Sequence, residues 1–178
     1  MPLKQWLRSP VLVFVSVLVV IGATTAFLGM KNAQAQDAQP IAFNHSVHVK
    51  DLGMSCLYCH SNAQRGQSAG LPTLEKCQGC HQQIDPGDNA ALQDLARYAE
   101  GNQPIQWVPV AIQPDFVYFS HRSHVNAGLN CETCHGEVGA MTVAVPQGDQ
   151  NMGWCLSCHK ELAPEHFTKL SDCATCHK

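Results

Sequence analysis

Basic residues are too scarce in this chain to form a nucleic-acid-binding surface. The 178 residues include 11 Lys and Arg against 14 Asp and Glu, and charged residues amount to only 14% of the sequence. From Ala38 to the C-terminus the balance is 8 Lys and Arg against 13 Asp and Glu, a formal net charge of −5. A protein that binds nucleic acid needs a basic patch or stripe. An acidic surface of this kind would instead suit a basic patch on a protein partner.

Charged residues are also absent from one long apolar run, residues 11–30. As a helix, such a run would span about 30 Å, which is enough for the hydrocarbon core of a bilayer. Lys4 and Arg8 precede the run and favour a cytoplasmic N-terminus. We therefore expect residues 1–33 to form a single-pass anchor in the cytoplasmic membrane, with the rest of the chain on the periplasmic side. A cleaved signal peptide, with Ala33-Gln34-Ala35 as its small-residue site, is the alternative.

Cysteine does not occur outside one short motif. Five times a Cys-x-x-Cys pair is followed directly by His, and the five motifs use all ten cysteines. In chain order, the first to fifth motifs are Cys56-Leu-Tyr-Cys59-His60, Cys77-Gln-Gly-Cys80-His81, Cys131-Glu-Thr-Cys134-His135, Cys155-Leu-Ser-Cys158-His159 and Cys173-Ala-Thr-Cys176-His177. This spacing is the attachment signature of c-type haem, because two thiols add to the porphyrin and the adjacent imidazole reaches the iron. The sequence therefore predicts five covalent haem c groups, with the five motif histidines as iron ligands.

Other uses of paired cysteines fit this chain poorly. A zinc site built from Cys-x-x-Cys pairs needs two pairs per metal, and five pairs leave one over. Zinc ribbons, rubredoxin-like iron sites and dithiol redox centres do not need His after each second Cys. A disulfide within Cys-x-x-Cys is possible in an oxidising compartment, but it would hold almost nothing together. Covalent haem is thus the interpretation that uses every feature of the motif.

Five further histidines match the five irons in number. They are His45, His48, His121, His124 and His166. Four of them form two pairs in matching contexts, Phe43-Asn-His45-Ser-Val-His48 and Phe119-Ser-His121-Arg-Ser-His124, each just upstream of a motif. Two imidazoles at i and i+3 on a helical turn point roughly the same way, so one turn could serve two neighbouring irons. His166 stands alone before Cys173 and could serve the fourth or fifth haem.

Methionine competes with histidine for one of these positions. Met54, Met141 and Met152 lie in the same region, and Met152-Gly-Trp154 runs directly into Cys155. We expect Met54 to pack against a porphyrin, as Met does in irregular cores. Met141 or Met152 could instead be an iron ligand that displaces a histidine, and a thioether ligand would raise the potential of that iron.

The chain is short for the number of cofactors that it is predicted to hold. About 140 residues for five haems leave fewer than about 30 residues per cofactor, too few for a conventional apolar core. We therefore expect a mostly irregular fold with short α-helices, in which haems form the core. After a polar linker at residues 34–40, the haem domain would cover residues 41–178. Residues 41–81 would hold two haems and residues 119–178 three.

An insert without any haem motif, residues 82–118, separates these two parts. Asp88 is predicted to cap a helix over residues 89–100, and Gly101 to end it. Residues 106–113 are predicted to be extended. We expect the insert to cover a haem or to dock a partner.

The Phe-x-His-x-x-His pattern before Cys-x-x-Cys-His resembles the cytochrome c3/c7 superfamily of multihaem cytochromes. In that family, the first His of the pair ligates the haem of the motif just downstream, and the second His reaches a different haem. The resemblance implies that His45 pairs with His60, and His121 with His135. It implies that His48 and His124 serve other irons, without saying which.

Further segments resemble the pentahaem subunit of alternative complex III, a quinol-oxidising membrane complex. They are Pro104-Ile-Gln-Trp107, Phe116-Val-Tyr-Phe119-Ser-His121, Cys134-His135-Gly136, Met152-Gly-Trp154-Cys155 and Cys173-Ala-Thr-Cys176-His177-Lys178, together with the N-terminal run and the first motif. This resemblance implies a membrane anchor and partner subunits: an iron–sulfur protein, polytopic membrane subunits and a monohaem cytochrome c. It also implies that one haem is ligated by His and Met.

These features predict electron transfer from quinol oxidation to a cytochrome c, a copper protein or an oxidase, without catalysis by the chain on its own. Open iron sites in multihaem enzymes are often marked by Lys in place of the motif His, and all five motifs here end in His. A stand-alone membrane quinol dehydrogenase, a multihaem reductase and a protomer of an extracellular haem filament are the competing hypotheses.

Overall fold

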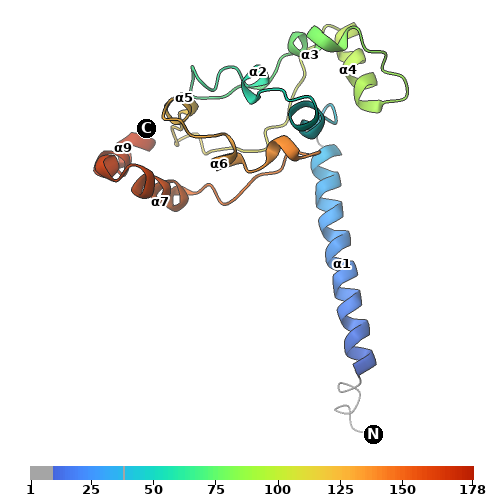
Figure 1. The fold of residues 1–178 in the computed structure, drawn as a ribbon, viewed down its shortest axis with the longest axis horizontal. Coiled ribbons are helices and arrows are strands. Elements are labelled where there is room, and N and C mark those ends of the chain that lie inside the picture. The colour runs from blue at the N-terminus through green and yellow to red at the C-terminus, as the bar shows by residue number, and fades with distance from the viewer. Residues whose placement is uncertain (1–9, 38) are drawn as a thin grey trace. The chain divides into compact units, whose positions relative to one another are not determined.

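The computed structural model describes residues 10–37 and 39–178 (Figure 1). It divides into two compact units, Met1–Ala38 and Gln39–Lys178. Within the N-terminal unit, side chains are described for residues 11–25. The boundary between the units lies in the segment 34–40 that the sequence predicts as a linker.

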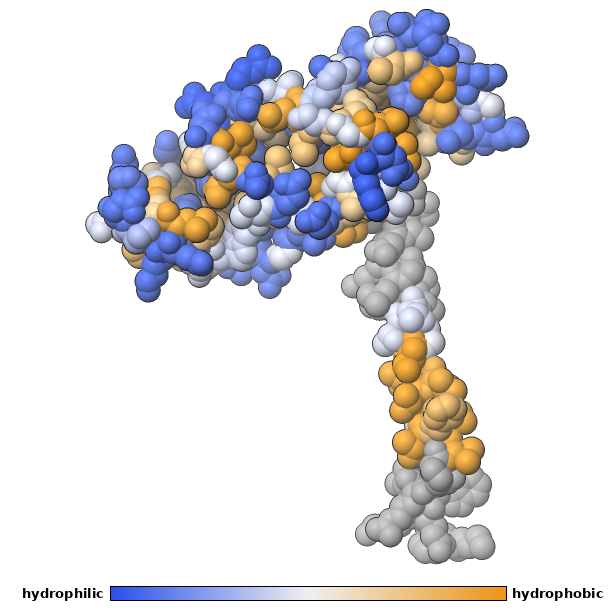
Figure 2. Space-filling view, viewed as in Figure 1, coloured by the Kyte–Doolittle hydropathy of each residue, from blue (hydrophilic) through white to orange (hydrophobic). Residues whose placement is uncertain are grey.

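In the N-terminal unit, the described residues form one helix, α1 (Pro10–Asp37). Proline suits the first turn of a helix because its missing N–H would have no partner there. Apolar side chains cover the described part of α1 and are exposed, Val11 and Val19 by 67% and 64% (Figure 2). No helix among the described residues is both long and apolar enough to cross a membrane, so the structure does not support the predicted transmembrane helix.

Short helices joined by irregular segments make up the C-terminal unit (Figure 1). They are η2 (Val47–Asp51), α2 (Cys56–Cys59), α3 (Leu74–His81), α4 (Ala90–Glu100), α5 (His121–Asn126), α6 (Glu132–His135), η3 (Val138–Ala140), α7 (Met152–Leu162), η4 (Pro164–His166), α8 (Phe167–Leu170) and α9 (Cys173–Cys176). Among residues 39–178 there is no strand beyond one isolated bridge between Val117 and His177. The prediction of a mostly irregular fold with short helices is confirmed.

The apolar core of this unit is small. Four buried side chains form one cluster, Ile41, Leu74, Leu95 and Ile105, and they bring α3 and α4 together. Ala63 is the one other buried apolar residue among the described side chains, and none of them is completely enclosed. A unit of this length normally buries a far larger apolar area, so side-chain packing alone accounts for little of its stability.

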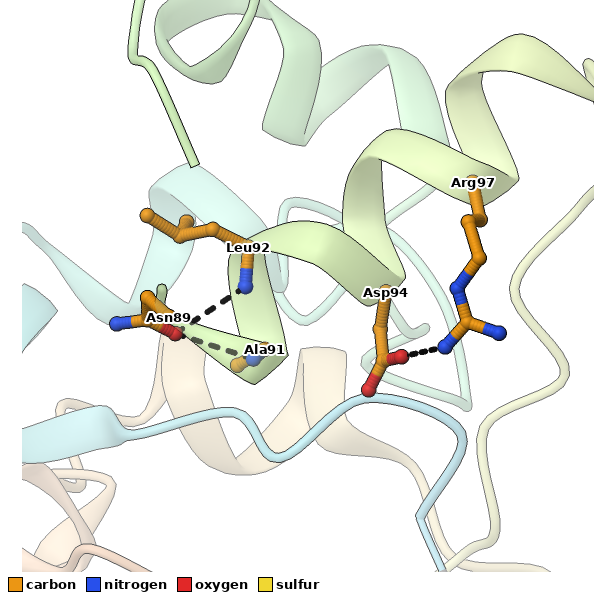
Figure 3. A network of polar contacts seen from close by, with 5 residues as sticks. All are labelled: Asn89, Ala91, Leu92, Asp94 and Arg97. Atoms are coloured by element: carbon orange, nitrogen blue, oxygen red, sulfur yellow. Dashed lines mark hydrogen bonds and ion pairs between the residues drawn. The ribbon is translucent and has the colours of Figure 1, made fainter. Parts of the chain in front are cut away.

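Helix α4 forms where the sequence predicts a helix, but a different residue caps it. The Asn89 side chain accepts hydrogen bonds from the backbone N–H groups of Ala91 and Leu92, at 3.0 and 3.2 Å (Figure 3). Asp88 is therefore not the cap, because it lies one residue too far from the free N–H groups of the first turn. On the exposed face, Asp94 pairs with Arg97 one turn later.

Helix α4 ends at Gly101, as the sequence predicts, although this glycine does not adopt the left-handed conformation that commonly ends a helix. Gly101 keeps a right-handed conformation with φ of −77°, and its N–H bonds the Arg97 carbonyl. The left-handed residue is Asn102, with φ of 46°. Asparagine tolerates this region better than most residues with a side chain, so it is Asn102 that turns the chain away from the helix.

Candidate functional site

Each Cys-x-x-Cys-His motif lies on or beside a short helix. The first and fifth motifs begin α2 and α9, where Ser55 and Asp172 accept a hydrogen bond from a backbone N–H in the first turn. The other three motifs lie in or at α3, α6 and α7. Because residues i and i+3 are neighbours on a helix surface, each helical turn places its two thiols on one side. The motif sequence thus folds locally into the arrangement that two-point attachment needs.

All ten thiols are free of disulfide bonds. Among the described residues, no group of three or more His, Cys, Asp or Glu side chains is placed to hold a metal ion. Burial raises the pKa of the Cys59 and Cys134 thiols, which favours neutral thiol over thiolate. Among the described residues, the ten cysteines therefore form neither of the two alternatives, zinc clusters or disulfides.

Three motif histidines face a second imidazole. The ring centres of His48 and His81 are 5.9 Å apart, those of His121 and His135 6.3 Å, and those of His124 and His159 6.0 Å. With about 2 Å for each metal–nitrogen bond and about 1.1 Å from nitrogen to ring centre, two imidazoles on opposite sides of one ion have centres about 6 Å apart. These three pairs fit an iron between them.

His45 lies near both His60 and His48. Burial lowers the pKa of His45, and the nearby rings of His60 and His48 lower it further. Burial likewise lowers the pKa of His135, with further contributions from His121 and His60. A lowered pKa keeps an imidazole neutral at neutral pH, and the neutral ring is the form that ligates a metal.

Hydrogen bonds fix which nitrogen of several rings is free. Nδ1 lies 2.7 to 2.9 Å from a backbone carbonyl in His48, His60, His121 and His124, whose partners are Asn44, Gly70, Gln67 and Ser120. A carbonyl only accepts, so in the neutral ring Nδ1 carries the proton and donates it, which leaves Nε2 as the free lone pair. Gly70 has φ of 77°, a conformation that glycine adopts without strain. All four rings are thus prepared to bind a metal through Nε2.

Three further rings are half-buried, and each has a buried nitrogen without a partner. Nδ1 of His45, His81 and His159 is buried without a hydrogen-bond partner among the described residues. Burying such a group costs free energy unless the ring is held by something else. This observation fits rings that are fixed by a bond from the other nitrogen, as in a metal site.

Two phenylalanines hold the paired histidines in the same way. Phe43 stacks on His48 with ring centres 4.5 Å apart and meets His45 edge-on at 4.9 Å. Phe119 stacks on His124 at 4.4 Å and meets His121 edge-on at 4.9 Å. The sequence repeat is therefore also a structural repeat, and each phenylalanine has a role in it that the sequence pattern alone did not predict. Their position two residues before each His pair was the signal that could have revealed it.

The thiols also show which motifs are neighbours. Burial raises the pKa of the Cys77, Cys131, Cys134 and Cys155 thiols, and a thiol of another motif raises each further. The neighbouring thiols are Cys59 for Cys77, Cys56 for Cys131, Cys158 and Cys155 for Cys134, and Cys176 for Cys155. By these thiol neighbours, the first motif lies near the second and third, and the fourth near the third and fifth, which leaves the second and fifth as end motifs with one neighbour each.

The two end motifs differ from the others in exposure. Cys80 of the second motif and Cys173 of the fifth are the exposed cysteines, and the other eight are partly buried. Exposure and thiol neighbours are separate observations, and both identify the same two motifs as the ends of the series.

The fifth motif histidine has no second imidazole beside it among the described residues. His177 stacks instead on Phe116, with ring centres 5.8 Å apart. The side chain of His166 is 71% exposed and lies 3.8 Å from the Glu165 carboxylate. Met152 starts α7 one turn before Cys155, whereas the Met141 carbonyl accepts a bond from Ser46 beside the first His pair. The predicted candidates for this site are thus dispersed, and Met152 is the one on a helix that carries a neighbouring motif.

Comparison with known proteins gives matches in both halves of the chain. Residues 117–178 match the family described as cytochrome c7 and related cytochrome c, and residues 23–106 match the class III cytochrome c family. The multiheme cytochrome c subunit of a menaquinone reductase from Nitratidesulfovibrio vulgaris is 32% identical over 165 residues, which cover 81% of this chain and 79% of that protein. A nine-heme cytochrome c from Desulfovibrio desulfuricans is 25% identical over 142 residues, which are 78% of this chain but only 37% of that protein.

Proposed function

We propose that this chain, which belongs to the multihaem c-type cytochromes, works as an electron-transfer subunit with five covalently bound haems. The observation that carries this proposal is the set of histidine rings held about 6 Å apart beside free Cys-x-x-Cys pairs. Bound haem c supplies a one-electron Fe(III)/Fe(II) couple at each motif. The residues of the chain attach the cofactor, orient the ligands and set the surroundings.

Four of the five proposed iron sites use two imidazoles each. The pairs are His45 with His60, His48 with His81, His121 with His135, and His124 with His159. Within each His pair, the first residue serves one motif and the second serves another. Because both rings sit on one helical turn against one phenylalanine, the pair holds two neighbouring sites at a fixed separation.

The sixth ligand at the fifth motif is proposed to be Met152. Met152 lies three residues before Cys155 on α7. Burial raises the pKa of the Cys155 thiol, and the neighbouring Cys176 thiol of the fifth motif raises it further. Met152 therefore lies on a helix that is next to the fifth motif. Exposure does not separate Met152 from His166, because they are 65% and 71% exposed. His166 instead lies 3.8 Å from the Glu165 carboxylate, and Met141 lies beside the first His pair. Thioether ligation raises the potential of an iron relative to ligation by two imidazoles, so the fifth site would have the highest potential.

Replacing Met152 tests this ligand. In the Met152→His variant we expect the highest-potential component of a redox titration to fall toward the other four, because imidazole stabilises Fe(III) more than a thioether does. Met141→Leu and His166→Ala serve as matched controls and should leave all five components in place. A titration that responds to His166→Ala and not to Met152→His would contradict the assignment.

The order of the motifs gives the route for electrons. The thiol neighbours support a series in which the second and fifth motifs are the ends, and both ends carry the exposed cysteines. Electron exchange with another protein requires close approach, which exposure permits. We therefore propose that electrons enter at one of these two motifs and leave at the other.

The redox partners are proposed to be subunits of a membrane quinone-linked complex. The N. vulgaris relative is a subunit of a menaquinone reductase, whereas the sequence resemblance to alternative complex III implies the reverse direction, quinol oxidation. Both relationships support a position beside other subunits that react with quinone, and a role in electron transfer without catalysis by this chain alone. The four paired sites also disfavour a multihaem reductase, because a second imidazole blocks substrate from the iron.

Membrane association of α1 is part of the same proposal, as predicted from the sequence. The exposed apolar side chains from Val11 to Ile21 support it, because water does not favour so many of them on one helix. Residues 39–178 would then lie outside the cytoplasm, where c-type cytochrome domains are found.

One purification from native membranes tests the proposed function. We expect the chain in the membrane fraction, with a mass that exceeds the bare peptide by five haems, together with iron–sulfur and polytopic membrane subunits. Assays of the purified assembly with a menaquinol and with a menaquinone then decide the direction of electron flow. Purified chain alone that reduces a cytochrome from menaquinol would favour the stand-alone dehydrogenase. A mass equal to the bare peptide would refute the function altogether.

A further inference from the structure

The histidine of the fifth motif lies just beyond its helix, as the histidine of the first motif does. His81, His135 and His159 lie within α3, α6 and α7. His60 follows its helix, but its Nδ1 bonds the Gly70 carbonyl at 2.7 Å. His177 follows α9 in an extended conformation, with φ of −112° and ψ of 123°, one residue before the last residue of the chain. Its orientation must therefore come from a distant segment.

Three consecutive residues of the insert supply that contact. The Phe116 ring stacks on the His177 ring at 5.8 Å with 28° between the planes. Val117 forms the antiparallel bridge with His177, and the Tyr118 N–H donates to the Cys176 carbonyl at 2.6 Å. The Lys178 ammonium lies 5.2 Å from the centre of the Tyr118 ring.

The segment that makes these contacts is itself held by a turn. The Val117 N–H donates to the Pro114 carbonyl at 2.8 Å, which closes a β-turn over residues 114–117. The chain then continues directly into Phe119, His121 and His124 of the second His pair. One short segment thus contacts the fifth motif and provides histidines that face the third and fourth.

We infer that Phe116 is a positioning residue for His177 and that residues 116–118 clamp the C-terminal motif in place. This inference rests on the proposed function, because it concerns an iron ligand. A stacked ring restricts rotation of the imidazole about its bond to the chain, and the direction of the imidazole plane affects the electronic state of the iron that it binds. Phe116 sets this plane at the fifth site, as Phe43 and Phe119 do for the paired histidines.

Core packing is a poor explanation for Phe116. Its side chain is 60% exposed among the described residues, so packing against other side chains accounts for little of its presence there. The contact with His177 is the aromatic one that the structure gives it. A residue that acted only as apolar cover would tolerate leucine, whereas a stacked ring would not.

The test compares Phe116→Leu with Phe116→Tyr in the full holoprotein. We expect both to carry the same number of haems by mass, and Phe116→Leu to change the oxidised-to-reduced ratio of one component, at fixed ambient potential, on the order of threefold. The ferric low-spin signal of that component should broaden, because the imidazole plane is no longer fixed. Phe116→Tyr keeps the stacked ring and should therefore match the parent protein in both the oxidised-to-reduced ratio and the ferric low-spin signal.

Ile112→Ala provides the matched control, since Ile112 lies in the same insert and is 75% exposed without an aromatic contact. Ile112→Ala should change neither the oxidised-to-reduced ratio nor the ferric low-spin signal. If Phe116→Leu matches the parent protein in titration and spectrum, the inference is wrong while the proposed function stands. If the parent protein itself carries no haem, the proposed function fails first, and the inference with it.

Discussion

Replacing His124 with alanine is expected to leave the site of the fourth motif without its second imidazole. The ring centres of His124 and His159 are 6.0 Å apart, and Nδ1 of His124 donates to the Ser120 carbonyl at 2.8 Å. Nε2 of His124 is therefore the proposed iron ligand that the alanine substitution removes. About one fifth of the iron should become high-spin, measured by electron paramagnetic resonance and optical absorption of the ferric protein. That iron should then bind a small external ligand such as imidazole, which should restore the low-spin signal.

His121→Ala is the matched variant on the same helical turn. It should also convert about one fifth of the iron, but at the third motif, because His121 faces His135 at 6.3 Å. Combining His124→Ala with substitution of Cys155 and Cys158 should abolish its high-spin signal, because the affected haem is then not attached. If His124→Ala affected the third motif instead of the fourth, the pairing that we propose would be wrong.

Substitution of Cys131 and Cys134 together by alanine is expected to unfold much of the C-terminal unit. The third motif lies in the middle of the series, next to both the first and the fourth. The one cluster of buried apolar side chains, which includes Leu74 and Leu95, lies at α3 and α4 and contains no residue of the third motif. Loss of attachment should therefore cost on the order of 5 kcal/mol, which is comparable with the whole stability of a small domain.

Limited proteolysis and circular dichroism of the purified variant measure this effect. The control is the same double substitution at the fifth motif, Cys173 and Cys176, which lies at one end of the series and at the end of the chain. This control should lose one haem and fray locally, while the cluster around Leu74 stays protected. Equal protection of the two variants would show that side chains alone sustain the fold.

Features that depend on neighbours along the chain were predictable. The five motifs, the two His pairs and the short helices follow from local spacing, since attachment and a helical turn each involve residues three or four positions apart. The insert helix was predicted as well. Its cap is Asn89 and not Asp88, an error of one residue that adjacent capping side chains make easy.

The predicted transmembrane helix is not supported, and alternative complex III remains a proposal that the menaquinone reductase relative does not specifically support.

The choice of partner for each second histidine could not be predicted. The sequence placed His48 and His124 near iron but left their irons open. In the structure His48 faces His81 and His124 faces His159, across contacts that join distant segments, such as the bond from the His121 N–H to the Gln67 carbonyl. The same holds for Phe116, whose stacking on His177 depends on the chain returning from the insert to the C-terminus.

The sequence by itself thus predicted what this protein binds and where each cofactor would be attached. Attachment needs two thiols and an imidazole within five consecutive residues, and local backbone geometry is enough to bring them together. Only the tertiary structure decided which imidazoles face each other, which motifs are neighbours and which two are exposed at the ends. These properties depend on the path of long irregular segments, and no periodic pattern in the sequence encodes that path.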